Sequence, residues 1–216
     1  MAPLRILLAN HYPIIRSSLR LLLEREPEFQ VVGEAANGRE AVVLADYRHP
    51  DIVLLEVKLP HLNGIAAARE IASKEGCSQV VFVTTHTDEG YVGEAFRAGA
   101  RGYVLGDAAP TDLPQAIRAV ISSRLFLSPA LSRQLLEGSA RGDSKDGDLS
   151  ERQKELCCLL AAGYSEEEMG QHLHREFPQL QADLQAVSDA LERRRMPEVL
   201  RKTIWENQHL LEQAGR

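Results

Sequence analysis

The stretch 51-DIVLLEVKLPHLNG-64 decides the fold of this chain. Its first half, Ile52–Leu55, is aliphatic, too short for a helix and too apolar for a half-exposed strand, so it predicts a buried central strand of a parallel sheet. Glu56 follows directly, and Pro60 and Gly64 lie in the loop behind it. Open α/β sheets carry their functional groups at the carboxyl ends of parallel strands. We therefore expect Glu56 at the functional edge of the sheet.

Four further strand-helix units are expected along residues 1–125, before and after this strand. Each joins a short apolar run to a segment with apolar residues at helical spacing. The expected strands are Leu4–Ala9, Phe29–Ala35, Ile52–Leu55, Gln79–Thr84 and 102–105. Five alternating units predict a flavodoxin-like (βα)5 domain, an α/β fold with a doubly wound parallel sheet.

The remaining residues predict a second, all-α part. Residues 126–137 form one extra helix that begins near Pro129. Residues 138–148, GSARGDSKDGD, contain nothing apolar to bury apart from one alanine and predict a flexible linker. Apolar residues at helical spacing then predict a small helical domain over 149–216.

Composition narrows the class of function. The net charge of -6 gives no global attraction to nucleic acid or to anionic membranes. Three cysteines without a paired spacing favour a reduced, cytoplasmic setting, and no apolar run is long enough to span a membrane. No phosphate-binding glycine loop, nucleophile-base pair or metal motif is present, so we expect a non-enzyme without cofactor or metal.

Four segments resemble one protein family over nearly the whole chain. They are HYPIIRSSLRLLLE, VVGEAANGREAV, THTDEGYVGEAFRAGARGYVLGDA and LSERQKELCCLLAAGYS. On these segments the chain resembles the LuxR-type (NarL-like) response regulators of two-component systems. The resemblance implies a receiver domain, an extra helix, a linker and a helix-turn-helix output domain that binds DNA in transcription regulation.

The resemblance also implies a phosphorylation pocket, from which this chain departs. A receiver uses three carboxylates that hold Mg²⁺, one of them the phosphoacceptor Asp, together with a hydroxyl, an aromatic ring and a lysine. The matching positions here are Asn10, His11, Glu56, Thr84, Tyr103 and Gly106. Only the hydroxyl of Thr84 and the ring of Tyr103 agree with the family's pattern.

These departures change the expected chemistry. Mg²⁺ prefers anionic oxygen ligands, so one carboxylate in place of three predicts weak binding. We expect a pseudo-receiver that works without phosphorylation. Three interpretations of Glu56 stay open: a fixed mimic of a phosphorylated Asp, a residual carboxylate in a domain that does not switch, and a site of residual phosphorylation.

The output domain departs from the family's pattern as well. The segment HREFPQLQ adds about four residues to the expected tight turn before the recognition helix, which we place at 182–195. From Ser150 onward, nine Lys and Arg face twelve Asp and Glu, whereas a DNA reader ordinarily has a basic footprint. Arg193, Arg194 and Arg195 are the candidate DNA contacts, but a helix-dipole role and a solvated face are together favoured over phosphate contacts for them. The alternative function is an adaptor that binds a protein partner.

Two apolar helical stripes predict a homodimer, because a stripe wider than one core can cover is often buried by a symmetric partner. One comprises Leu131, Leu135 and Leu136, and the other comprises Leu200, Ile204, Trp205 and Leu211. Trp205 fits either a core position or a dimer anchor. The alternative is that both stripes pack within their own domain.

Overall fold

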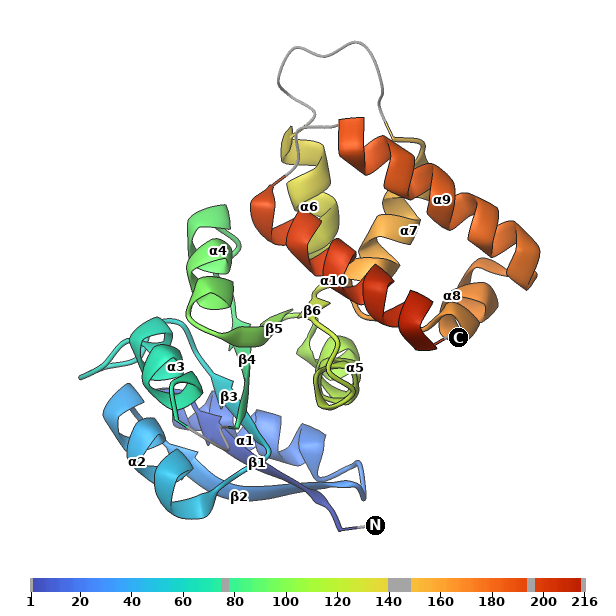
Figure 1. Cartoon of the computed structure of the whole chain (residues 1–216). Coiled ribbons are helices and arrows are strands. Elements are labelled where there is room, and N and C mark those ends of the chain that lie inside the picture. Colours follow the sequence, from blue (N-terminus) through green and yellow to red (C-terminus); the bar gives the residue numbers. More distant parts are fainter. Residues whose placement is uncertain (1, 75–77, 140–148, 194–196, 215–216) are drawn as a thin grey trace. The chain divides into compact units, whose positions relative to one another are not determined.

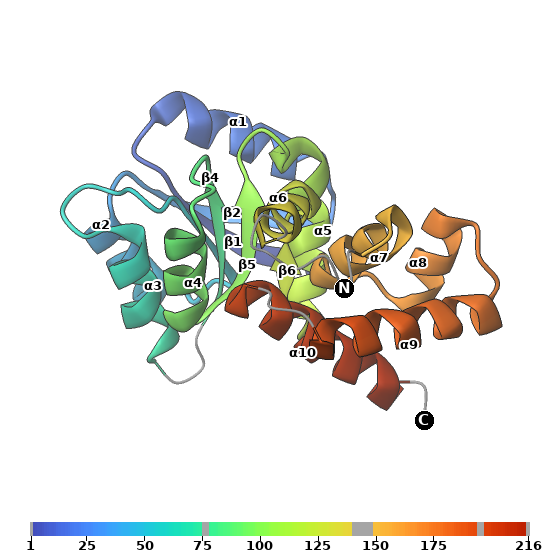
Figure 2. The same cartoon turned by 90° about the horizontal axis from the view of Figure 1, so that it is seen from above.

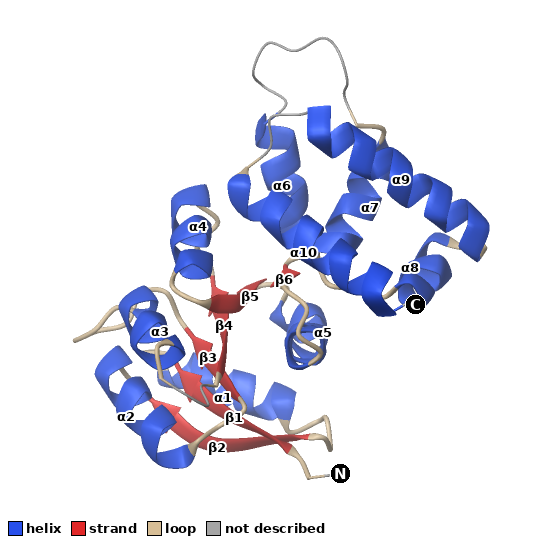
Figure 3. Cartoon of the chain, viewed as in Figure 1, coloured by secondary structure: helices blue, strands red, loops and turns tan. Residues whose placement is uncertain are grey.

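A computed structural model of the chain describes residues 2–74, 78–139, 149–193 and 197–214 (Figure 1). Its contacts divide the chain into two compact units, Met1–Ile121 and Ser122–Arg216. The first is an α/β unit, and the second is helical apart from one short strand (Figure 3). The predicted fold class, α/β plus all-α, is confirmed. No helix among the described residues has the length and apolar character that crossing a membrane requires.

Strands and helices alternate along the first unit. In chain order they are β1 (Leu4–Ala9), α1 (Pro13–Leu23), β2 (Phe29–Ala35), α2 (Gly38–Arg48), β3 (Ile52–Leu55), α3 (Gly64–Ala72), β4 (Gln79–Thr84), α4 (Glu89–Arg97), β5 (Ala100–Leu105) and α5 (Ala109–Ile121). The strands lie in the order β2-β1-β3-β4-β5, and each neighbouring pair is parallel. This is the flavodoxin-like arrangement expected from the sequence.

Helices cover both faces of this sheet. α1 lies beside α5 on one face, while α2, α3 and α4 lie side by side on the other (Figure 2). Strand β3 is therefore enclosed by β1, β4 and two helical layers, and each of its four side chains is at most 2% exposed. Burial on all sides explains why the strand is continuously apolar.

Polar side chains fix where the helices of the first unit begin. Asn37, Asn63 and Asp88 precede α2, α3 and α4, and each accepts a hydrogen bond from a backbone N–H of the first helical turn. These bonds satisfy donors that a helix start otherwise leaves free. Because Asn63 sits seven residues after Glu56, its cap also anchors the loop that leaves the functional edge.

The second unit contains β6 (Phe126–Leu127), α6 (Pro129–Ser139), α7 (Glu151–Ala161), α8 (Glu166–Leu173), α9 (Phe177–Arg193) and α10 (Glu198–Ala214). The extra helix expected before the linker is α6, which packs on α7 within this unit. Residues 140–148 of the expected linker lie outside the described residues.

The turn between α8 and α9 is short, so the prediction of a lengthened turn is wrong. α8 ends just before His174, which adopts a left-handed conformation with φ 51°, and α9 already begins at Phe177. The additional residues extend α9 at its start instead. Pro178 explains the difference, because its fixed φ and missing N–H suit the first turn of a helix.

The apolar stripes considered for dimerisation have different environments. Leu131, Leu135 and Leu136 are buried, as are Leu200 and Ile204 of α10. Trp205 is 61% exposed, so it is not a core residue, and its ring meets the ring of His209 edge to face with centroids 4.1 Å apart. The α6 stripe thus packs within its own chain, whereas α10 carries an exposed aromatic ring.

Candidate functional site

The candidate pocket lies at the carboxyl ends of β1, β3, β4 and β5. The parallel register places Ala9 beside Leu55 and Thr84 beside Leu105, so these strands end at a common edge. The backbone N–H of Glu56 donates to the carbonyl of Ala9 over 2.9 Å, which continues the pairing past the strand end. The residues matched to a phosphorylation pocket stand at this edge: Asn10, His11, Glu56, Thr84, Tyr103 and Gly106.

The Glu56 carboxylate is held by three hydrogen bonds to one of its oxygens. Oε1 accepts from the hydroxyl of Thr84 over 2.5 Å and from the backbone N–H groups of Val57 and Lys58 over 2.7 and 3.4 Å. Hydrogen bonds to an ionised acceptor are shorter and stronger than neutral ones. Glu56 therefore draws the Thr84 side chain toward the end of β3.

The end of β1 presents an amide and an imidazole. Asn10 is 3% exposed, and its Oδ1 accepts the backbone N–H of Tyr12 over 2.9 Å. Its carbonyl accepts from the guanidinium of Arg16 over 2.6 Å. Nδ1 of His11 is buried and makes no hydrogen bond to the described residues. An amide and an imidazole thus stand where the family's pattern has acidic side chains, and the neighbouring Arg16 is ion-paired with Glu34.

Tyr103 is fully buried, and its hydroxyl donates to the carbonyl of His86 over 2.8 Å. Burial, reinforced by the negative charge of Glu56, raises the pKa of the Tyr103 phenol well above its usual range. The Tyr103 hydroxyl is therefore a neutral hydrogen-bond donor, and its ring lies in the interior of the first unit. The backbone N–H of His86 also lies 3.4 Å from Thr84 Oγ1. The backbone of His86 therefore contacts both Thr84 and Tyr103.

Gly106 follows β5, where the resemblance places a lysine. Its N–H donates to the carbonyl of Thr84 over 2.9 Å. A Cβ built on Gly106 would have its nearest neighbour at 3.6 Å, which is ordinary contact. Packing at this position therefore admits a Cβ, so no clash at the backbone requires glycine here.

The loop that follows Glu56 is closed by Gly64. The N–H of Gly64 donates to the carbonyl of Val57 over 2.8 Å. A Cβ on Gly64 would lie 2.0 Å from the carbonyl oxygen of Glu56, far inside van der Waals contact. Glycine is therefore required at this position so that the loop can fold back on the residue that carries the carboxylate.

The surface of α9 has little positive charge. Residues 177–189 contain no Lys or Arg. Asp183 forms an ion pair with Arg152 and lies 4.0 Å from Arg175. Of the candidate DNA contacts, Arg193 is the last residue of α9, while Arg194 and Arg195 lie outside the described residues.

Sequence reasoning missed two features. One is His86, whose backbone links Thr84 to Tyr103; only its place two residues after β4 could have indicated this role. The other is a cleft between α8 and α9 beside Phe177, which depends on the short turn that the sequence did not predict.

Comparison with known proteins identifies the family. The model of the response regulator receiver domain matches residues 6–118. The transcriptional regulatory protein YxjL of Bacillus subtilis is 31% identical over 176 residues, which cover 79% of this chain and 81% of YxjL. The chain therefore belongs to the response regulator family, in its LuxR-type (NarL-like) branch.

Solved structures agree with this assignment. A LuxR-family two-component response regulator from Aurantimonas is 36% identical, with a TM-score of 0.61 over 65% of this chain and all of that chain. RcsB of Salmonella typhimurium covers 93% of this chain and 97% of its own with a TM-score of 0.60. At 22% identity RcsB shows the fold alone, and it shows that fold for both parts of the chain.

Proposed function

We propose that this response regulator acts in transcription control independently of phosphorylation, with Glu56 as a built-in substitute for a phosphorylated Asp. The observation that carries the proposal is the 2.5 Å hydrogen bond from Thr84 Oγ1 to Glu56 Oε1. The Thr84 hydroxyl already donates to a carboxylate of the chain itself, that of Glu56, and the Tyr103 side chain is fully buried. Membership in the response regulator family supports the setting in transcription control, as does the name of YxjL, an uncharacterized transcriptional regulatory protein.

The donor set at this edge does not suit Mg²⁺. A hard cation that favours carboxylate oxygens would meet the Asn10 amide, which already accepts the Tyr12 N–H, and the His11 imidazole. The guanidinium of Arg16, which is ion-paired with Glu34, donates to the backbone carbonyl of Asn10 at the same strand end, so it brings no oxygen ligand there. We therefore assign no Mg²⁺-dependent step to this pocket.

The hydrogen bonds favour the fixed mimic over the other two roles considered for Glu56. A residual carboxylate in a non-switching domain needs no contact with Thr84, and an acceptor for phosphate needs both its metal and a lysine. Glu56 instead engages Thr84 directly, and Gly106 offers no cation. An acceptor without those charges loses the electrostatic stabilisation on which phosphoryl transfer depends.

We expect acetyl phosphate with Mg²⁺ to leave the chain unmodified, because both acidic ligands and the lysine are absent at Asn10, His11 and Gly106. Intact-mass spectrometry of the treated protein measures this directly. The positive control is a variant that restores the family's pattern through Asn10→Asp, His11→Asp, Glu56→Asp and Gly106→Lys. A phosphoryl adduct on the natural chain that disappears in Glu56→Ala would refute the proposal.

We also infer that the protein forms a homodimer, and that its assembly does not respond to a phosphoryl donor. The exposed Trp205 on α10 supports a contact through this helix, because large exposed aromatic rings are enriched at interfaces. Leu135, the alternative anchor on α6, is only 6% exposed and belongs to its own core. A substitution at Leu135 would therefore report on folding rather than on assembly.

We expect sedimentation at micromolar concentration to give a dimer with or without acetyl phosphate and Mg²⁺, and a weakened dimer for Trp205→Ala. Loss of a central aromatic contact typically weakens association by about tenfold or more. Tyr47→Ala, which removes an exposed aromatic ring from α2, is the matched control. A monomer at every concentration would exclude the dimer.

A protein-binding adaptor is the second candidate function. It is favoured by the charge of the output helices, since α8 opens with Glu166, Glu167 and Glu168 and residues 177–189 of α9 have no basic side chain. Phosphate contacts normally supply much of the affinity for DNA. RcsB, which shares the fold, has been solved in complex with DNA, so DNA remains the competing ligand.

A further inference from the structure

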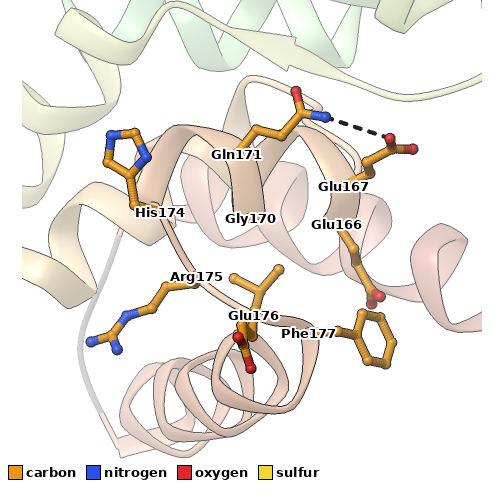
Figure 4. Close-up of a pocket in the computed structure, with 9 residues that line it drawn as sticks. Glu166, Glu167, Gly170, Gln171, His174, Arg175, Glu176 and Phe177 are labelled. Carbon is orange, nitrogen blue, oxygen red and sulfur yellow. Dashed lines mark hydrogen bonds between the residues drawn. The ribbon is translucent and has the colours of Figure 1, made fainter.

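A cleft of about 700 Å³ opens between α8 and α9 in the second unit. Its sides come from Glu166, Glu167 and Gln171 of α8 and from Phe177 at the start of α9, and the backbone of Gly170 lies between them (Figure 4). The volume falls within the range of pockets that bind small molecules, so the cleft has room for side chains of a bound partner.

The tight turn creates this cleft. The N–H of Arg175 donates to the carbonyl of Gly170 over 2.8 Å, which brings the two helices together at the left-handed His174. A Cβ on Gly170 would stand 3.1 Å from the Arg175 carbonyl, so a glycine keeps this corner open. The cleft is therefore formed by α8, the turn that follows it and the start of α9.

The cleft combines an apolar surface with unpaired negative charge. Leu180 is buried at its base, whereas Phe177 is 63% exposed. Within the described residues, Glu166, Glu167 and Glu176 have no ion-pair partner; Glu166 and Glu167 accept bonds only from the neutral amides of Gln181 and Gln171. In Figure 4 the side chain of Glu166 lies beside the Phe177 ring.

The one arginine of the cleft does not neutralise these carboxylates. Arg175 donates to Gln179 over 2.9 Å and lies 4.0 Å from Asp183 on α9. Its side chain points away from Glu166 and Phe177 (Figure 4). The cleft lining therefore combines carboxylates that have no ion-pair partner among the described residues with an exposed aromatic ring, and its negative charge repels a nucleic-acid backbone.

We propose that this cleft binds a basic segment of a partner protein, with an aliphatic side chain packed on Phe177 and lysine or arginine side chains facing Glu166 and Glu176. Exposed apolar surface rimmed by charge is characteristic of protein docking sites. Complementary charge selects a cationic partner and speeds its encounter. The proposal gives the adaptor candidate a specific surface and does not depend on the state of Glu56.

Two capped amphipathic peptides test the proposal on the full chain. One carries lysine at every charged position, and its twin carries glutamate at the same positions with the same leucines. We expect the lysine peptide to bind in fluorescence anisotropy and the glutamate peptide not to bind. Amide chemical shifts of residues around Gly170 and Phe177 should move on binding.

Variants separate this site from general attraction to an acidic protein. Phe177→Ala should weaken binding about tenfold, as expected for an aromatic anchor. The pair Glu166→Gln and Glu176→Gln should weaken it about fivefold, whereas the charge-matched pair Glu24→Gln and Glu89→Gln in the first unit should leave it unchanged. Phe177 is exposed, so its loss leaves the fold intact.

Three results would overturn the proposal. The first is equal binding of the lysine peptide to all variants. The second is that neither peptide binds. The third is that duplex DNA competes with the lysine peptide and shifts the same amide signals. The last would assign the cleft to nucleic acid. A phosphoryl adduct on Glu56 would refute phosphorylation independence but would leave these results unchanged, so the two proposals fail separately.

Discussion

Replacing Asn207 with leucine will lower the free energy of unfolding of the second unit by about 3 kcal/mol or more. The side chain of Asn207 is fully buried on α10. Its Nδ2 donates to the carbonyls of Leu125 and Leu160 over 2.9 and 2.7 Å, and its Oδ1 accepts the N–H of Leu125 over 2.8 Å. Leucine has a similar shape but leaves all three backbone groups without a partner, and each unsatisfied buried group costs about 1–3 kcal/mol.

The single tryptophan makes this measurable, since Trp205 lies in the same unit and reports its unfolding in urea by fluorescence. Gln213→Leu is the matched control, because it makes the same kind of change at an exposed position of α10. We expect that control to stay within about 0.5 kcal/mol of the natural protein. Equal stability of the two variants would show that Asn207 does not hold the start of the unit to α7 and α10.

Local pattern was enough to predict most of the fold. The aliphatic run Ile52–Leu55 identified the central strand, because a strand buried on both faces is apolar at consecutive positions and four residues are too few for a helix. The start of α2 depends on an equally local contact, since the capping side chain of Asn37 bonds to its own helix. Asn207 could not be found in this way. Its partner Leu125 is 82 residues away, and no spacing along the chain connects them.

The start of α9 shows where local rules conflict. We placed Pro178 within a lengthened turn, HREFPQLQ, ahead of a recognition helix at 182–195. The same residue is favourable in the first helical turn, and the left-handed His174 completes the turn in few residues. The cleft at Phe177 follows from this choice, which explains why the sequence did not indicate it.

The candidate pocket was predictable as a set of positions but not as a set of contacts. Parallel strands end at one edge, so Glu56 was expected there from its place after β3. The resemblance to receiver domains supplied the other positions, Asn10, His11, Thr84, Tyr103 and Gly106. Whether Glu56 reaches Thr84 depends on side-chain rotamers and on the path of the following loop. Gly64 sets the path of this loop, but the sequence indicated Gly64 only as one residue of the loop.

Gly64→Ala will therefore destabilise the first unit by about 3 kcal/mol or more, because the new methyl group overlaps backbone atoms that cannot move independently. It would lie 2.0 Å from the carbonyl oxygen of Glu56 and 3.0 Å from that of Val57. Relief requires the loop to open, which breaks the 2.8 Å hydrogen bond from the Gly64 N–H to the Val57 carbonyl. Opening also displaces the Glu56 carboxylate from the Thr84 hydroxyl.

Gly106→Ala is the control on the same edge of the sheet. Its methyl group meets only ordinary contacts, the nearest at 3.6 Å, so we expect a change within about 0.5 kcal/mol. Hydrogen exchange of the β3 amides measures the stability of this unit, and the chemical shift of Thr84 reports its bond to Glu56. Faster exchange with a displaced Thr84 signal in Gly64→Ala alone is the expected result. Equal protection in both variants would mean that the loop accommodates the methyl group, and that Gly64 does not hold Glu56 against Thr84.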